Sequence, residues 1–109
     1  MPREWTFEDA LPVIGSITEG NAWDSSRLLF TNIAMNRMLA YDPATGTVVT
    51  ERSGTNAANG LNFDAQGRLF ACEGGGRRIA MYEDGKPGVT VVDRLNGKRI
   101  NGPNDLAID

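Results

Sequence analysis

The sequence predicts an all-β fold, because short apolar segments separated by tight turns recur with a period of about forty residues. Ala22-Trp23-Asp24 is followed by Asn62-Phe63-Asp64 and then by Ala107-Ile108-Asp109. Arg37 to Tyr41 recurs in the same way as Arg78 to Tyr82. Thirteen glycines and five prolines in 109 residues argue against a helical repeat. A period of this size is typical of the four-stranded blade of a β-propeller.

The first repeat, residues 19–52, is predicted to be one blade that follows a lead-in segment over residues 1–18. A helical turn is expected at residues 6–11 of the lead-in. The sequence from Asp42 to Gly46 predicts a hairpin turn, because Pro43 fixes φ and Gly46 permits a positive φ. The expected strands of this blade cover residues 21–24, 27–32, 37–42 and 47–52.

The second repeat, residues 58–93, is predicted to be another blade of the same plan. Leu69-Phe70 repeats Leu29-Phe30 of the first blade. Residues 95–103 are interpreted as a connection, and residues 103–109 as the start of a third blade whose first strand covers 104–109. The chain is therefore predicted to be one partial propeller of about two blades plus a strand. The expected strands of the second blade cover residues 60–64, 68–73, 77–82 and 89–93.

The composition excludes several classes of function. The net charge of −3, without a basic block, argues against nucleic acid as a partner. No apolar run is long enough to cross a membrane, and no signal peptide is recognised, so a cytoplasmic location is expected. The chain has no histidine to activate a nucleophile. Its single cysteine, Cys72, is therefore interpreted as a small buried hydrophobic residue.

A candidate site follows from the positions that precede the repeated Asp residues. In a propeller the start of each inner strand lies at the mouth of the central channel, so Glu19, Asn59 and the Asn104-Asp105 pair should converge there. Their donors are all oxygen atoms, a set that suits a hard cation such as calcium. The alternative is that Asn-Gly and Asn-Asp are simply turn residues.

Other conspicuous side chains are given structural interpretations. Arg77 and Arg78 are expected on a solvated strand or rim. Glu73 is expected to be a strand-end acid that faces solvent, with a ligand at the rim as the alternative. The apolar residues expected to pack in the core or between blades are Trp5, Trp23, Met35, Met38 and Met81.

Several segments resemble landmarks of one known family. Thr18 to Asp24 resembles the "EGP-x-W" opening of the gluconolactonase/regucalcin family. Phe30 to Ile33, Ala58 to Asp64 and Ala71 to Gly75 resemble the segments that follow it in that family. Lys98 to Leu106 resembles the family's "KR-x-N-x-PND-L" segment. The resemblance covers almost the whole chain and corresponds to the first third or so of a typical member.

The resemblance implies a six-bladed propeller that holds one divalent cation, usually calcium, and hydrolyses a sugar lactone. Carried over by position, Glu19 and Asn104 would be metal ligands, and Asn104 would also face the substrate. Asp105 would be a candidate base or would act behind the metal ligands. Arg99 resembles an arginine that holds substrate, and Asn59 falls at a position that lines the site.

The chain differs from the family pattern at two positions and lacks some of the family's metal ligands. Asn21 stands where the family usually has Pro, and Gly74 stands where many members have His. The family's later metal ligands have no counterpart in these 109 residues, so the chain is expected to be a fragment that is inactive alone. A closed ring would need the missing blades or self-assembly, for example of three copies. The alternative function is a non-enzymatic propeller that binds a small molecule or protein.

Overall fold

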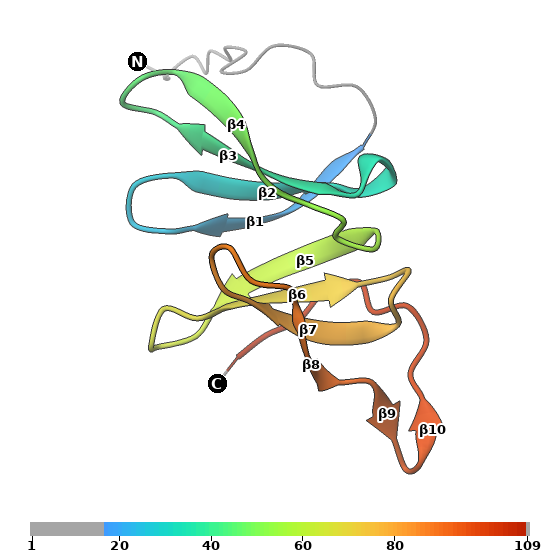
Figure 1. Cartoon of the computed structure of the whole chain (residues 1–109). Helices are drawn as coiled ribbons and strands as arrows, with labels where there is room; N and C mark the ends of the chain where they lie inside the picture. The colour runs from blue at the N-terminus through green and yellow to red at the C-terminus, as the bar shows by residue number, and fades with distance from the viewer. Residues whose placement is uncertain (1–16, 109) are drawn as a thin grey trace, which may run out of the picture.

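The structure, a computed structural model, describes residues 17–108 and is entirely β apart from one 3-10 turn in that range (Figure 1). Its strands form two four-stranded antiparallel sheets and one two-stranded hairpin. The helical turn expected at residues 6–11, and Trp5, lie outside the described residues. No helix between residues 17 and 108 is long and apolar enough to span a membrane.

The first sheet is a simple meander in the order β1-β2-β3-β4. A 3-10 turn, η1 (Ile33–Met35), joins its second and third strands. The turn between β1 and β2 is closed by Asp24, whose Oδ1 accepts hydrogen bonds from the backbone N–H groups of Ser26 (3.0 Å) and Arg27 (2.6 Å). The strands are β1 (Thr18–Trp23), β2 (Leu28–Asn32), β3 (Arg37–Asp42) and β4 (Thr47–Ser53).

The second sheet repeats this plan in the order β5-β6-β7-β8. The eight strands predicted for the two repeats are all confirmed, with ends that differ by no more than three residues from the expected ones. The strands are β5 (Ala58–Phe63), β6 (Leu69–Glu73), β7 (Arg78–Tyr82) and β8 (Val89–Val92).

A short hairpin that was not predicted from the sequence, β9 (Arg94–Leu95) and β10 (Lys98–Arg99), begins one residue before the connection expected at residues 95–103. Asn96 and Gly97 form its two-residue turn, and both have a positive φ, 53° and 79°. An Asn-Gly pair at these positions matches the twist of a two-stranded hairpin. The hairpin projects away from the two sheets (Figure 1).

The strand register corrects one of the repeat alignments. Leu28 pairs with Tyr41 in the first sheet and Leu69 pairs with Tyr82 in the second, so Leu69 is equivalent to Leu28, not to Leu29. The reason lies in the turns that precede these strands. The Asp24 N–H donates to the Arg27 carbonyl, whereas the Asp64 N–H donates to the Arg68 carbonyl, so the second turn is one residue longer.

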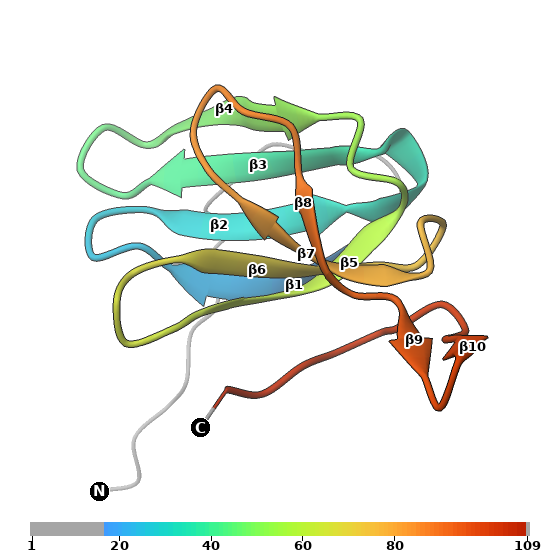
Figure 2. The same ribbon diagram turned by 60° about the horizontal axis from the view of Figure 1, so that its bottom comes forward.

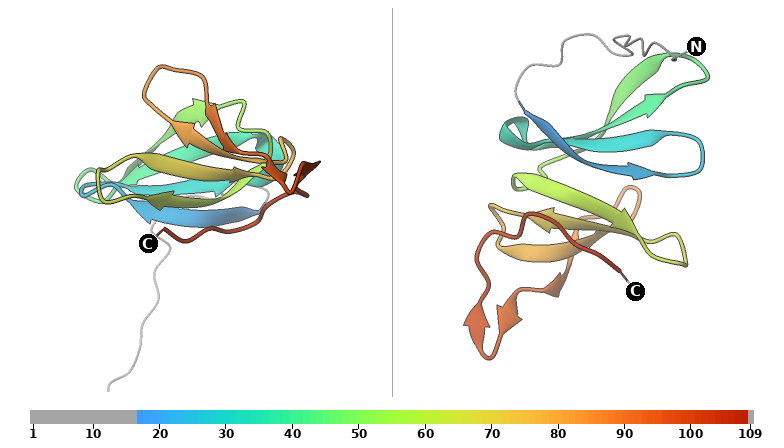
Figure 3. Two further views of the ribbon diagram at one scale, coloured as in Figure 1. Left: turned by 90° about the horizontal axis from the view of Figure 1, so that it is seen from below. Right: turned by 180° about the vertical axis from the view of Figure 1, so that it is seen from behind.

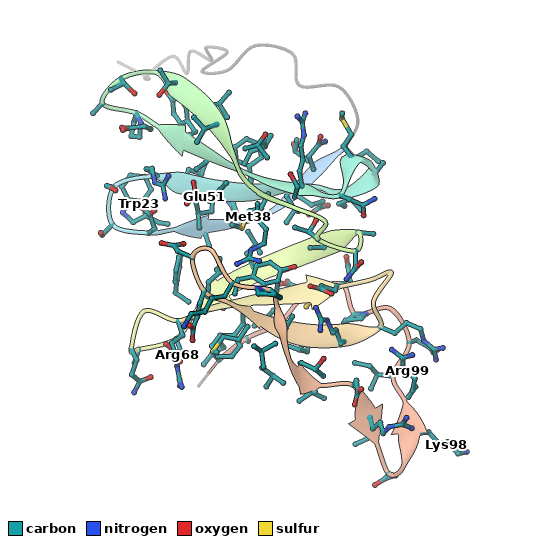
Figure 4. The ribbon with its side chains drawn as sticks, viewed as in Figure 1. Trp23, Met38, Glu51, Arg68, Lys98 and Arg99 are labelled. Carbon is teal, nitrogen blue, oxygen red and sulfur yellow. The ribbon has the colours of Figure 1, made fainter. Side chains whose placement is uncertain are left out.

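The main core lies between the two sheets, which stack face to face (Figure 2). Met38 occupies this layer between the sheets (Figure 4), as expected, and is 3% exposed. The buried residues of this cluster are Leu29, Met38 and Ala40 from the first sheet and Ala58, Leu61, Leu69, Ala71, Ala80 and Tyr82 from the second.

Three burial predictions are wrong. Trp23 is 55% exposed because Ala22, its neighbour on the alternating strand β1, is the residue that packs against the core. Met35 is 52% exposed because it lies in the η1 turn beyond the end of the sheet. Glu73, expected to face solvent, is buried and paired with Arg78.

The segment after Pro103 does not form the strand predicted for residues 104–109 in its described part, which ends at residue 108. It runs along the same side of the molecule as β1 and β5 (Figure 3). The N–H of Gly60 on β5 donates to the carbonyl of Asn104 at 2.9 Å. In both sheets the first strand of the meander forms its ladder with the strand that follows it in the chain. The single hydrogen bond from Gly60 does not form such a ladder, so residues 104–108 are not a strand.

Candidate functional site

Three equivalent segments lie next to one another along the inner edges of the sheets. Glu19-Gly20 lies on β1, Asn59-Gly60 lies on β5, and Asn104 follows on the C-terminal segment. A Cβ atom on Gly20 would lie 1.8 Å from the carbonyl oxygen of Asn59, and a Cβ on Gly60 would lie 2.8 Å from that of Asn104. The same glycine-mediated approach therefore occurs twice, and it brings the predicted positions side by side.

Asn59 and Asn104 meet directly. The side-chain amide of Asn59 donates a hydrogen bond through Nδ2 to Oδ1 of Asn104. The backbone of Asn59 is also held from the first sheet, because the hydroxyl of Thr31 donates to its carbonyl oxygen at 2.9 Å. The structure thus brings together two of the predicted site residues, and Asn59 is held both by the first sheet and by the C-terminal segment.

Glu19 lies one strand away from this pair and faces solvent. It pairs in the ladder with Thr31, the residue whose hydroxyl binds Asn59. Among residues 17–108, its carboxylate accepts only a long, 3.4 Å hydrogen bond, from the N–H of Gly20 to Oε2. Its carboxylate is therefore exposed to solvent on β1, the strand that approaches β5 at Gly20 and Asn59.

Asp105 faces a different direction from Asn104. Its Oδ1 lies 2.9 Å from the position that a Cβ on Gly60 would occupy, and it accepts the N–H of Leu106 at 2.8 Å. Cys72 lies inside the second sheet, where burial raises the pKa of its thiol to about 11. The negative charge of Asp105 adds a smaller increase to this pKa. Asp105 therefore faces the second sheet, and Cys72 is buried, as predicted.

Arg99 is not brought to the two asparagines. It lies on β10, away from the sheets (Figure 4), and its guanidinium donates to the carbonyl of Gly76 at 2.8 Å. Arg77 reaches back from the same β6–β7 turn and donates to the carbonyl of Ile100 at 2.9 Å. These two bonds tie the hairpin to the turn, and none of the hydrogen bonds among residues 17–108 joins Arg99 to Asn59 or Asn104.

The donors suit a hard cation in type but fall short in number. Glu19 and Asn104 offer carboxylate and amide oxygens, and an amide oxygen has a second lone pair when one is used by Asn59. Calcium takes about six to eight oxygen ligands. Within residues 17–108 there is no group of three or more Asp, Glu, His or Cys side chains that could hold a metal ion.

A buried polar network that was not predicted from the sequence surrounds Glu73, which is 1% exposed. Its carboxylate accepts hydrogen bonds from Arg78 Nε (2.7 Å), Asn56 Nδ2 (2.8 Å) and the Tyr82 hydroxyl (2.7 Å). Burial raises the pKa of Glu73, but the bonds from Arg78, Asn56 and Tyr82 outweigh that effect and hold it below its usual value. The spacing of Glu73 and Arg78 repeats that of Asn32 and Arg37, and this was the available signal.

A groove of about 1000 Å³ lies between the sheets at the end opposite to Glu19 and Asn59. Arg52 of β4 crosses it, donating to the carbonyls of Glu83 (2.6 Å) and Lys86 (2.8 Å) and lying 4.2 Å from the centre of the Tyr82 ring. Arg27 spans the first sheet to Glu51 with a 2.9 Å ion pair. Arg52 thus joins the two sheets across the groove, whereas the ion pair of Arg27 lies within the first sheet.

The chain belongs to a known family. Its sequence matches the model of the SMP-30/gluconolactonase/LRE-like region over residues 17–109, most of its length. The resemblance found in the sequence motifs is therefore confirmed. A search of curated proteins gave no match.

Two solved structures share both sequence and fold with the chain. One is a gluconolactonase from Xanthomonas campestris, with 35% identity, a TM-score of 0.77, and coverage of 83% of this chain and 30% of that one. The other is a putative gluconolactonase, with 30% identity, a TM-score of 0.79, and coverage of 85% and 33%. The chain thus spans about a third of either structure, and its antiparallel sheets are consistent with part of a propeller.

Proposed function

We propose that this chain carries part of the site of a calcium-dependent lactonase that opens sugar lactones such as gluconolactone. The observation that supports this most directly is the row formed by Glu19, Asn59 and Asn104 on neighbouring inner edges. In this proposal the two described sheets are two blades of a six-bladed ring. The family and the two gluconolactonase structures give the substrate class.

The roles of the residues follow from what they contact. Glu19 and Asn104 would hold the cation, and a bound calcium ion would supply Lewis-acid polarisation of the lactone carbonyl. Asn59 orients the amide of Asn104 through its hydrogen bond and lines the substrate side. Asp105, which faces Gly60 and accepts the Leu106 N–H, fits a positioning role better than that of a base.

Two protein oxygens are too few for tight calcium binding, so activity requires further ligands. These would come from the rest of a longer chain or from other copies in a ring. We therefore expect the 109-residue chain alone to bind calcium weakly and to turn over little lactone. Its mass by light scattering, with and without calcium, distinguishes a ring of copies from a monomer.

The test combines calcium titration calorimetry with an assay of gluconolactone hydrolysis. Glu19→Gln keeps the size of the side chain but removes its charge, so we expect the heat of calcium binding to be lost. Glu83→Gln is the matched control, because Glu83 is exposed and its carboxylate binds Lys86 alone among residues 17–108. A heat of calcium binding that is measurable in the unmodified chain and equal in Glu19→Gln would contradict the proposed metal site.

One observation favours a second candidate, a non-enzymatic binding module. The asparagines at the inner edge cannot titrate, and the carboxylate that follows Asn104, that of Asp105, faces the second sheet. Such a surface can bind a polyol by hydrogen bonds without accepting a proton. Lactone binding without hydrolysis, in a chain assembled into a ring, would support this alternative.

A further inference from the structure

The connection between the two sheets holds an unfavourable backbone conformation immediately before the candidate site. Asn56 and Ala57 have φ values of 51° and 55°, so two consecutive residues other than glycine are left-handed. Each costs about 1–2 kcal/mol relative to a right-handed residue, more for Ala than for Asn. Such a conformation persists only where the surroundings hold it in place.

The first sheet holds this connection through Asn36. The Oδ1 atom of Asn36, the residue after η1, accepts the N–H of Ala57 at 2.6 Å. The backbone carbonyl of Asn36 also accepts the N–H of Thr55 at 3.3 Å. One asparagine of the first sheet therefore binds the connection at two points.

The second sheet holds the same two residues from the other side. Glu73 Oε1 accepts the side-chain amide of Asn56 at 2.8 Å. In the turn after Glu73, the N–H of Gly75 donates to the Asn56 carbonyl (2.8 Å) and that of Gly74 donates to the Ala57 carbonyl (3.2 Å). The buried carboxylate and the turn together fix the orientation of both peptide groups.

The position of Asn59 depends on this arrangement. β5 begins at Ala58, directly after the left-handed pair, and Asn59 is its second residue. The ladder between β5 and β6 is irregular here, since Ala58 pairs with Glu73 and the next pair is Leu61 with Ala71. The ladder by itself therefore does not fix the register at Asn59, which leaves this to the connection before it and to the Thr31 hydroxyl.

We propose that Glu73 and Asn36 are positioning residues for the candidate site. They hold Asn56 and Ala57 in the left-handed conformation and thereby set where Asn59 and Gly60 meet Asn104. The catalytic meaning of this arrangement rests on the proposed lactonase function, but the positioning itself does not. No contact of Glu73 or Asn36 with substrate is implied.

The experiment uses three Asn→Gly variants of the 109-residue chain, read by NMR amide hydrogen exchange. Asn56→Gly and Asn36→Gly each remove one side-chain hold, while glycine retains the left-handed backbone without strain. Asn96→Gly is the matched control, because Asn96 has the same conformation (φ 53°) in the exposed β9–β10 turn. The probes are the Gly60 amide, which donates to Asn104, and the side-chain amide of Asn59.

We expect exchange at Gly60 to rise about tenfold in Asn56→Gly and Asn36→Gly, the effect of losing one hydrogen bond. The Asn59 side-chain signal should move in both, while the amides of β3 and β7 keep their protection. Asn96→Gly should change none of these probes. Unchanged Gly60 exchange, or an equal rise at every amide, would overturn the proposal. Absence of lactone turnover in the unmodified chain would count against the proposed function only.

Discussion

The two sheets follow one plan but differ in chemistry at one buried pair. In the first sheet Asn32 pairs with Arg37 across β2 and β3, and Asn32 Oδ1 accepts the Arg37 Nε at 2.9 Å. In the second sheet Glu73 pairs with Arg78 across β6 and β7, and Glu73 Oε1 accepts the Arg78 Nε at 2.7 Å. The same geometry is therefore built once with a neutral acceptor and once with a charged one.

The difference shows what a buried carboxylate requires. A charge removed from water is stable only when its remaining oxygen lone pairs are also satisfied. Glu73 meets this need with Tyr82 and Asn56 in addition to Arg78. Because Asn56 binds Glu73, the charged pair also holds the segment that joins the two sheets. A charged acceptor binds this segment more firmly than a neutral one would.

A substitution at the inner edge can break the contact between the two sheets, and we expect it to lower the free energy of unfolding more than any other change. In Gly20→Ala the new Cβ would lie 1.8 Å from the carbonyl oxygen of Asn59, and the backbone there has a φ of +44°. The first strand must then move away from the second sheet, at an expected cost of more than about 3 kcal/mol. Urea unfolding measures the loss of stability.

Gly46→Ala is the control for the backbone part of that effect. Gly46 has a φ of +70°, and no atom lies within 4 Å of the position that a Cβ would occupy there. Its substitution should cost about 1–2 kcal/mol, from the left-handed backbone alone. Equal losses for the two variants would show that the close approach of Gly20 and Asn59 is not important.

The comparison between the two buried pairs is tested next by truncating each acceptor. Glu73→Ala leaves the Arg78 guanidinium, 22% exposed, without its carboxylate, and should lower the free energy of unfolding by about 3 kcal/mol. Asn32→Ala removes a neutral acceptor from Arg37 and a donor to the Ile17 carbonyl, and should cost about 1–2 kcal/mol. A larger loss for Asn32→Ala, by denaturant unfolding, would reverse this interpretation.

The charged pair should also make stability depend on pH in a way that the neutral pair does not. The pKa of Glu73 is lowered on folding, so the unfolded chain binds the proton more readily. Its stabilisation is complete above the unfolded pKa, near the usual glutamate value of 4.5, and is lost as the pH falls through the folded value.

Glu73→Gln should therefore flatten the fall in unfolding free energy on acidification below about pH 5. Part of the fall should remain, because hydrogen bonds in the turns also lower the pKa values of Asp24 and Asp64 against the effect of burial. Denaturant unfolding at a series of pH values measures the slope. An unchanged slope in Glu73→Gln would contradict the lowered pKa.

The smallest effect concerns a second pair of equivalent positions, Thr31 and Cys72. Thr31 pairs with Met38 and Cys72 with Ile79, but only Thr31 makes a hydrogen bond to the neighbouring segment, at Asn59. With a pKa of about 11 and no exposed surface, the Cys72 thiol should react with iodoacetamide at pH 8 only after unfolding. Mass spectrometry of the chain treated with iodoacetamide, with and without urea, measures the labelling of Cys72. Rapid labelling of the folded chain would contradict this prediction.

Much of the fold was predictable from local patterns. The repeated Asp residues act in their turns as their chemistry suggests: Asp64 binds the backbone N–H groups of Gln66 (3.0 Å) and Arg68 (2.8 Å), as Asp24 does in the first repeat. The β9–β10 hairpin was missed although its Asn96-Gly97 turn is a local signal, because it lay in a segment interpreted as a connection.

The candidate site was predictable in part for the same reason. Repeat position placed Glu19, Asn59 and Asn104 on neighbouring inner edges, since equivalent residues of a repeat adopt equivalent places. The direction of Asp105 and the distance of Arg99 from the asparagines were not predictable, because both depend on how the C-terminal segment crosses the second sheet.

The sequence by itself determined the two meanders, their turns and the family, because strand alternation, turn chemistry and repeat spacing are local properties of the chain. The tertiary structure alone decided which acid is buried and which tryptophan is exposed: Glu73 lies where Arg78, Asn56 and Tyr82 converge, and Trp23 lies on the outer face of β1. These outcomes depend on groups that are distant in sequence, whose contacts exist only once the two sheets have packed.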